Sequence, residues 1–133
     1  MSVEKLNPEG LHEPVDNLYS HVVRYTGGLN VTIGGQVALD VQGNNVFVDD
    51  MAGQIRFCYE QVSLALAAVR LTWENVVHIY TFTTAMDEYM RYERSIAKEF
   101  FGEDPPASTL VEVSRLVDPE WLVEVQVEAV ADE

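Results

Sequence analysis

Apolar and polar residues alternate along several short stretches of the chain, and this period of two predicts β-strands with one buried face. The strongest signal lies over 76–84, which is rich in β-branched and aromatic residues. Weaker strands are expected over 22–25, 29–33, 110–116 and 122–130. The first two of these flank Gly27-Gly28, a turn signal, so together they predict a hairpin.

Apolar residues recur at spacings of three and four in two longer stretches, which predicts two helices with one buried stripe each. The first is expected from 51 to about 70, with Asp49 or Asp50 as its cap. Its stripe consists of Met51, Ile55, Cys58, Val62, Leu66 and Val69. The second is expected over 86–101, and Gly102 ends it. Its stripe consists of Met86, Met90, Ile96, Ala97 and Phe100, interrupted by Glu93.

These elements follow the order ββαβαββ, and two helices on one face of a mixed sheet define a two-layer α+β fold. A length of 133 residues suits one domain over 1–133, in which 1–18 form an irregular N-terminal arm and 37–48 a loop. Because 76–84 carries apolar residues on both faces, the sheet face away from the helices is expected to be covered as well. That pattern favours an oligomer.

The charge of the chain narrows the possible partners. Eight basic and 22 acidic residues give a net charge of −14, whereas nucleic acid requires clustered Lys and Arg, so no nucleic-acid partner is expected. No membrane partner is expected either, because no stretch approaches the ~20 apolar residues of a membrane span. Residues 1–14 lack the apolar core of a signal peptide, and Cys58 is the only cysteine, which together favour the reducing cytoplasm.

Few residues indicate chemistry by their type and spacing alone. The three histidines, His12, His21 and His78, show no metal-ligand spacing, so neither a metal nor a cofactor is expected. We interpret His78 as a packed residue, His21 as a candidate for a ligand cleft, and Cys58 as part of the core. The pair Gly34-Gly35 allows either a bulge or the close approach of a ligand.

Several short motifs occur along the chain. Each alone is weak evidence for a relationship, but their order and spacing together are specific. The motifs are Ile33-Gly34-Gly35-Gln36-Val37, Asp50-Met51-Ala52-Gly53-Gln54, 82–89, Phe100-Phe101-Gly102, Pro105-Pro106-Ala107, 111–116 and 126–131. Over about 17–131 the chain resembles the reactive intermediate deaminase superfamily, also called Rid, YjgF or endoribonuclease L-PSP-like. This resemblance implies a chorismate-mutase-like fold and a homotrimer with clefts between its subunits. It also implies a small-molecule metabolite as partner, because known deaminases of the family hydrolyse enamines and imines to 2-oxo acids and ammonia.

The resemblance also implies which residues form the site. Glu128 matches the family's carboxylate that positions water and is the catalytic candidate, and Tyr19, Gly34 and Gly35 match ligand-binding positions of its cleft. Glu93 falls where the family has a polar cleft residue. Each also has a plainer interpretation: a surface tyrosine, a strand bulge, a glutamate at a helix edge and, for Glu128, a solvated strand face.

The chain departs from the family at two ligand-binding positions. Ser108 stands where the family has the arginine that binds the substrate carboxylate, and Leu110 replaces a polar or thiol side chain two residues later. A hydroxyl offers one neutral hydrogen bond in place of a bidentate ion pair, a loss of about 2–5 kcal/mol. The sequence therefore predicts that the chain is not a 2-imino acid deaminase. It leaves open hydrolysis or tautomerisation of another enamine or imine, ligand binding without turnover, and a protein-interaction role.

Overall fold

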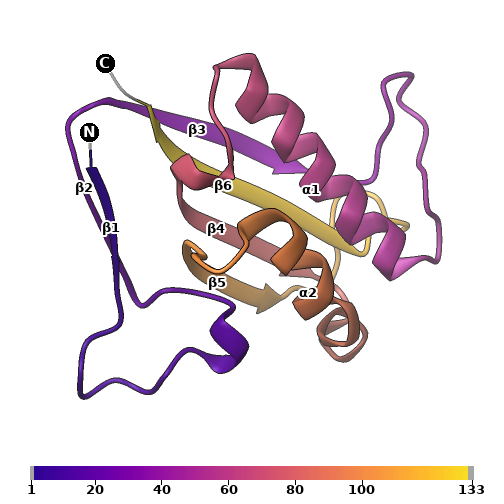
Figure 1. Ribbon diagram of the computed structural model, residues 1–133. Coiled ribbons are helices and arrows are strands. Elements are labelled where there is room, and N and C mark those ends of the chain that lie inside the picture. Colours follow the sequence, from indigo (N-terminus) through magenta and orange to yellow (C-terminus); the bar gives the residue numbers. More distant parts are fainter. Residues whose placement is uncertain (1, 132–133) are drawn as a thin grey trace.

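The computed structural model describes residues 2–131, and its main body is a four-stranded sheet with two helices packed on one face (Figure 1). The strands are β3 (Leu29–Gln36), β4 (Val76–Thr83), β5 (Ala107–Glu112) and β6 (Val123–Ala131), and the helices are α1 (Met51–Ala68) and α2 (Met86–Phe101). The predicted two-layer α+β fold with a mixed sheet is confirmed.

The strand order is β3-β6-β4-β5, so β6 lies in the interior of the sheet although it comes last along the described chain. β6 pairs antiparallel with both β3 and β4, whereas β4 and β5 are parallel and are joined through α2. Such a parallel pair needs a crossover connection of this kind. As a result β3 and β5 are the two edges of the sheet.

The core lies between the sheet and the helices. The predicted stripe of α1 is buried from Met51 to Leu66, and Asp50 caps the helix by accepting a hydrogen bond from the Gly53 amide at 2.9 Å. Val69 was expected to belong to this stripe but is 47% exposed, because α1 ends at Ala68.

In α2 the buried face differs from the predicted stripe. Tyr89, Ile96 and Ala97 are buried, whereas Met90 is 49% exposed. The apolar pattern assigned the buried position to Met90, but Tyr89 occupies it. A tyrosine ring can be buried when its hydroxyl has a hydrogen-bond partner, so its polar atom does not exclude it from the core.

The N-terminal segment corrects two predictions. Residues 1–18 are not irregular throughout, because Ser2–Leu6 form strand β1 and Val15–Asn17 a short 3₁₀ helix. Strand β2 (Val22–Thr26) does not form a hairpin with β3: within residues 2–131 it pairs with β1, in a separate two-stranded sheet. We call this two-stranded sheet the N-terminal ribbon. The sequence predicted that β2 would form its backbone hydrogen bonds with β3 across a tight turn. β2 forms them instead with β1, which lies about twenty residues earlier along the chain.

The remaining boundaries shift by a few residues. β5 was expected over 110–116 but begins at Ala107, directly after the proline pair, and ends at Glu112. None of the helices within residues 2–131 is both long enough and apolar enough to pass through a bilayer.

Candidate functional site

A cavity of about 330 Å³ lies where the N-terminal segment, α2 and the edge strand β5 meet, and we call it the β5-edge pocket. It is lined by Val15, Leu18, Tyr19, Met90, Glu93, Ser108 and Leu110. Four of these are residues that the sequence selected as site candidates: Tyr19, Glu93, Ser108 and Leu110. They come from three separate segments of the chain, so only the tertiary fold brings them together.

The strand period places Ser108 and Leu110 in this pocket. In the parallel pairing of β4 and β5, Ser108 lies opposite Ile79 and Leu110 opposite Thr81. Both of those β4 residues are buried, so Ser108 and Leu110 lie on the helix-covered face of the sheet.

Glu93 is the only carboxylate among the residues that line the pocket, and none of them is a lysine or an arginine. Burial raises the pKa of Glu93, and the hydroxyl of the buried Tyr89, one turn earlier on α2, opposes this by donating a hydrogen bond to Glu93 Oε1 at 3.4 Å. The pocket therefore presents one carboxylate on an otherwise largely apolar wall.

Tyr19 is held by two histidines of the N-terminal segment. Its hydroxyl lies 2.7 Å from His12 Nε2, and the three rings of His12, Tyr19 and His21 contact one another edge to face. His21 Nε2 donates to the His12 carbonyl oxygen at 2.7 Å. His21, a candidate for the cleft, is absent from the residues that line the β5-edge pocket. Sequence reasoning did not select His12, because His12 lies in the segment 1–18, where no period indicates which side chains point toward one another.

Glu128 lies on the other face of the sheet. It is half-buried and sits between Thr32 of β3 and His78 of β4 in the register of the three strands. There it lines a second cavity of about 240 Å³ together with Tyr25, Asn30, Thr32 and Val77, among others. A single chain therefore does not place Glu128 in the β5-edge pocket.

His78 and Tyr80 are neighbours of Glu128 on this open face. Their rings stack with centroids 4.1 Å apart and planes at 3°, and His78 Nε2 lies 3.0 Å from Thr109 Oγ1. Burial lowers the pKa of His78, and the charge of Glu128 opposes that shift. The pKa of Tyr80 is raised by desolvation and by Glu128. His78 is thus half-exposed beside the candidate carboxylate, and not simply a packed core residue.

Gly34 and Gly35 form a bulge, where the register between β3 and β6 shifts between Ile33 and Gln36. A Cβ added at Gly35 would lie 2.1 Å from Glu124 Oε2, so a side chain here would displace that glutamate. The bulge lies on β3, the sheet edge opposite β5, and the two glycines are therefore separated from Ser108 within one chain.

Other chemical candidates give no further site. Cys58 is fully buried, and burial raises its thiol pKa to about 12, as suits a core residue and not a nucleophile. Within residues 2–131, no three His, Cys, Asp or Glu side chains are grouped closely enough to hold a metal ion.

Comparison with known proteins agrees with this α+β fold of two helices on a mixed sheet. Residues 11–131 match the model of the family described as endoribonuclease L-PSP. The chain belongs to this family, which is part of the Rid/YjgF superfamily. A RutC family protein of Pyrococcus horikoshii is 28% identical over 113 residues, which are 85% of each chain.

Two solved structures extend the likeness to almost the whole chain. A protein of the Rid family from Yersinia pestis, YyfB, is 26% identical and covers 98% of this chain and 100% of its own, with a TM-score of 0.90. A member of the YjgF/YER057c/UK114 family from Mycobacterium tuberculosis is 25% identical over the same shares, with a TM-score of 0.67.

Proposed function

We propose that the chain binds a small metabolite of neutral or positive charge in clefts between subunits of a homotrimer, with the β5-edge pocket as one wall. The observation that carries this proposal is the lining of that pocket: Glu93 is its one charged side chain, and apolar side chains from three segments surround it. Pockets of a few hundred Å³ with few polar groups are typical of small-ligand sites.

The charge of the ligand follows from the side chains that can meet it. A carboxylate ligand would face Glu93 in a poorly hydrated pocket without a cation to pair with. An amine or an imine can instead donate hydrogen bonds to Glu93, Tyr19 and Ser108 while its carbon skeleton contacts Leu110 and Met90. This preference is the reverse of that implied for relatives with an arginine at position 108.

A second subunit supplies the other wall in this proposal. Ser108 lies on one edge strand and Gly34 and Gly35 on the other, with Glu128 on the strand beside them. Copies arranged around an axis can bring the β5 edge of one chain against the β3–β6 side of the next. The half-exposed residues on the open face, Tyr80 among them, are consistent with cover by another chain.

In this cleft we propose hydrolysis of an imine, with Glu128 as the proton carrier. A water oxygen adds to the imine carbon, its proton passes to the Glu128 carboxylate, and Glu128 returns a proton to the nitrogen, which gives a carbinolamine. The hydroxyl proton then moves to the nitrogen through the same carboxylate, the C–N bond breaks, and ammonia leaves a carbonyl product. An enamine enters the same path after protonation at carbon.

A set of three molecules with one carbon skeleton tests the ligand class. Isobutylamine, isobutyramide and isobutyrate carry a positive, a neutral and a negative head group. We expect the amine and the amide to raise the melting temperature and isobutyrate to leave it unchanged, because a ligand stabilises the state that binds it. Glu93→Gln should remove the preference for amine over amide. Stabilisation by isobutyrate alone would contradict the proposal.

Glu128→Gln separates catalysis from binding. An amine oxidase acting on isopropylamine supplies an imine without a carboxylate, and acetone release measures its hydrolysis. We expect Glu128→Gln to reduce the chain's acceleration of this hydrolysis by 10²-fold or more, the typical contribution of a general acid–base group, with amine binding retained. Binding with no acceleration by the unaltered chain would show a ligand-binding protein without turnover.

The same site predicts poor activity on 2-imino acids. With 2-aminoacrylate supplied by a dehydratase, we expect pyruvate release at the rate of the uncatalysed reaction. Ser108→Arg should restore acceleration, because the guanidinium supplies the bidentate partner that the substrate carboxylate lacks. Ser108→Lys is the matched control, because it supplies a positive charge but cannot pair with a carboxylate through two parallel hydrogen bonds. Acceleration by the unaltered chain equal to that of an arginine-containing relative would contradict this prediction.

A further inference from the structure

The N-terminal ribbon contains too few strands to account for its own stability. β1 and β2 pair antiparallel from Ser2↔Thr26 to Leu6↔Val22. Val22 and Tyr25 are 38% and 41% exposed. An isolated two-stranded sheet is at best marginally stable in water, and a third strand or a packed helix is normally required.

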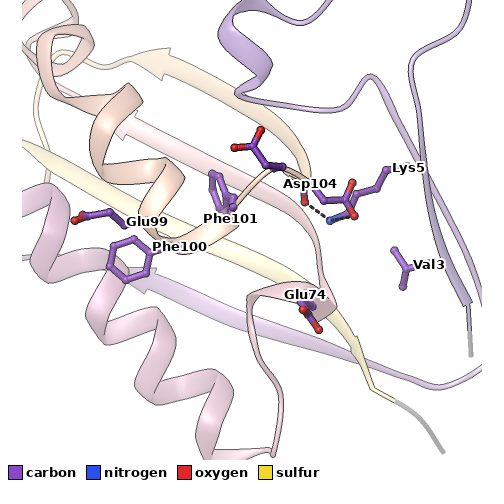
Figure 2. A pocket seen from close by; sticks show the side chains of 9 residues that line it. Val3, Lys5, Glu74, Glu99, Phe100, Phe101 and Asp104 are labelled. Carbon is purple, nitrogen blue, oxygen red and sulfur yellow. Dashed lines mark hydrogen bonds and ion pairs between the residues drawn. The ribbon is translucent and has the colours of Figure 1, made fainter.

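The base of the ribbon is fixed beside the β5 edge. Ser20 donates from its amide to the Pro106 carbonyl at 3.0 Å and from its hydroxyl to the Pro105 carbonyl at 2.7 Å, just before β5 begins. Lys5 Nζ lies 3.5 Å from the carboxylate of Asp104 and also donates to the Asp104 carbonyl oxygen. Figure 2 shows Lys5 at this contact. Val3 of β1 and Phe101 of α2 both line a cavity of about 600 Å³. The ribbon is thus anchored at one end and stands away from α2 along its length.

The far end of the ribbon reaches the opposite edge of the sheet. Leu29, the first residue of β3, pairs with Ala131, and a Cβ added at Gly28 would lie 2.0 Å from the Ala131 carbonyl oxygen. Segment 20–28 therefore runs from the β5 edge to the β3 edge across the end of the sheet, as Figure 1 shows. At about 3.3 Å per residue it can span the roughly 14 Å between the edges of a four-stranded sheet. With both ends held, β2 cannot lie along β3 of its own chain.

β3 is consequently an edge strand without a second partner among residues 2–131, and the bulge at Gly34-Gly35 is the one feature of its sequence that protects it. Its eight residues, LNVTIGGQ, include no charged residue and no proline. Natural edge strands usually carry such residues, because an unprotected edge pairs with other chains. An edge of this kind is typical of a strand that is covered in the assembled protein.

We propose that β2 of one copy of this chain pairs antiparallel with β3 of a second copy, so that the hairpin predicted from the sequence is completed between chains. Gly27 and Gly28, with φ values of 64° and 77°, connect β2 and β3 through a bend that does not bring the two strands together within one chain. Exchange of an identical element between subunits satisfies the same pairing with a partner chain. In the register of such a hairpin, Val23 of one chain lies opposite Thr32 of the other. This inference is independent of the ligand proposed above.

Single-cysteine chains test the pairing directly. Val23 is half-buried and Thr32 exposed, and the one native cysteine, Cys58, is buried and does not compete. One chain carries Val23→Cys and a second, distinguished by a tag, carries Thr32→Cys. After the two are refolded together and oxidised, we expect a disulfide-linked heterodimer on a non-reducing gel, because directly opposed residues on paired strands bring their Cβ atoms within disulfide range. Neither chain alone should give this band.

Two controls define the outcomes that would overturn the proposal. Val23→Cys mixed with Thr109→Cys tests pairing at the β5 edge instead. A heterodimer in this mixture, with none in the mixture of Val23→Cys and Thr32→Cys, would show that β2 pairs with β5 and not with β3 of the second copy. The double variant Val23→Cys/Thr32→Cys should form links between chains, and a disulfide within a monomer would show that the hairpin closes on itself. If a variant does not fold, light scattering of the unaltered chain decides, since a particle of 15.0 kDa excludes exchange.

Discussion

At the scale of single residues, the character of the β5-edge pocket depends on one half-buried carboxyl group, that of Glu93. Glu93 interrupts an otherwise apolar helix stripe, and the sequence identifies it for that reason. Its contact with Tyr89 could not be predicted in the same way, because the apolar pattern assigned the buried position to Met90. Ser108 and Leu110 were selected through a family motif, and the strand register explains why both lie in one pocket.

Glu93 should make stability depend on pH. Burial raises its pKa above the ordinary value of 4.5, so the folded chain keeps the proton to a higher pH than the unfolded chain does. The stability linked to the protonated form is complete below pH 4.5 and is lost as pH rises through the folded pKa. Gln cannot ionise. We therefore expect the melting temperature of Glu93→Gln, relative to that of the unaltered chain, to rise between pH 4 and pH 7.

Thermal melts of both chains across that range provide the measurement. Asp87→Asn, in the first turn of the same helix, is a suitable control because Asp87 is exposed. Its melting temperature should follow that of the unaltered chain at every pH. Parallel curves for Glu93→Gln and the unaltered chain would show that burial of Glu93 has no energetic consequence.

At the scale of elements, Gln54 connects α1 to two loops. It is fully buried, and its amide group donates to the carbonyl oxygens of Phe47 at 3.1 Å and Glu120 at 2.9 Å. Its Oε1 accepts from the Leu122 amide at 2.8 Å. One side chain thus satisfies three backbone groups in segments that have no regular secondary structure, which places the start of β6 relative to α1.

Gln54→Leu should therefore be strongly destabilising. It leaves the Glu120 carbonyl and the Leu122 amide without the partner that Gln54 supplies, whereas the Phe47 carbonyl still accepts from the Asp50 amide at 3.1 Å. Each unpaired buried group costs about 1–3 kcal/mol. We expect a loss of about 3 kcal/mol or more in the free energy of unfolding, measured by urea denaturation. Gln61→Leu, on the same helix and half-exposed, should change stability by under about 0.5 kcal/mol. Similar effects of the two substitutions would show that the Gln54 contacts contribute little.

The elements also show what local sequence patterns determine. Both helices and the strands of the main sheet were predictable, because period, caps and turn residues act within a few positions. The partner of β2 was not predictable, since an alternating pattern states that a strand has a buried face and does not identify its neighbour. For the same reason, the separation of Glu128 from Ser108 became apparent only with the strand order.

At the scale of the whole molecule, a net charge of −14 sets the long-range field. The family is described by the name of an endoribonuclease, whereas RNA binding depends on Lys and Arg contacts to phosphates. We expect a labelled single-stranded RNA to show no retention by this chain in filter binding at low salt, where electrostatic attraction would be strongest. A basic RNA-binding protein is the positive control. Retention that weakens steeply with added salt would contradict this prediction.

The position of β6 has a consequence for how the chain acquires its structure during synthesis. β6 pairs with both β3 and β4, and residues 29 and 131 are partners although a hundred residues separate them. A ribosome must therefore synthesise almost all of the described chain before the four-stranded sheet can form. Until β6 is available, no strand connects β3 to β4. Contacts so distant along the chain are slow to form, and unpaired strands readily associate. We expect nascent chains stalled before residue 123 to be protease-sensitive and to require chaperones.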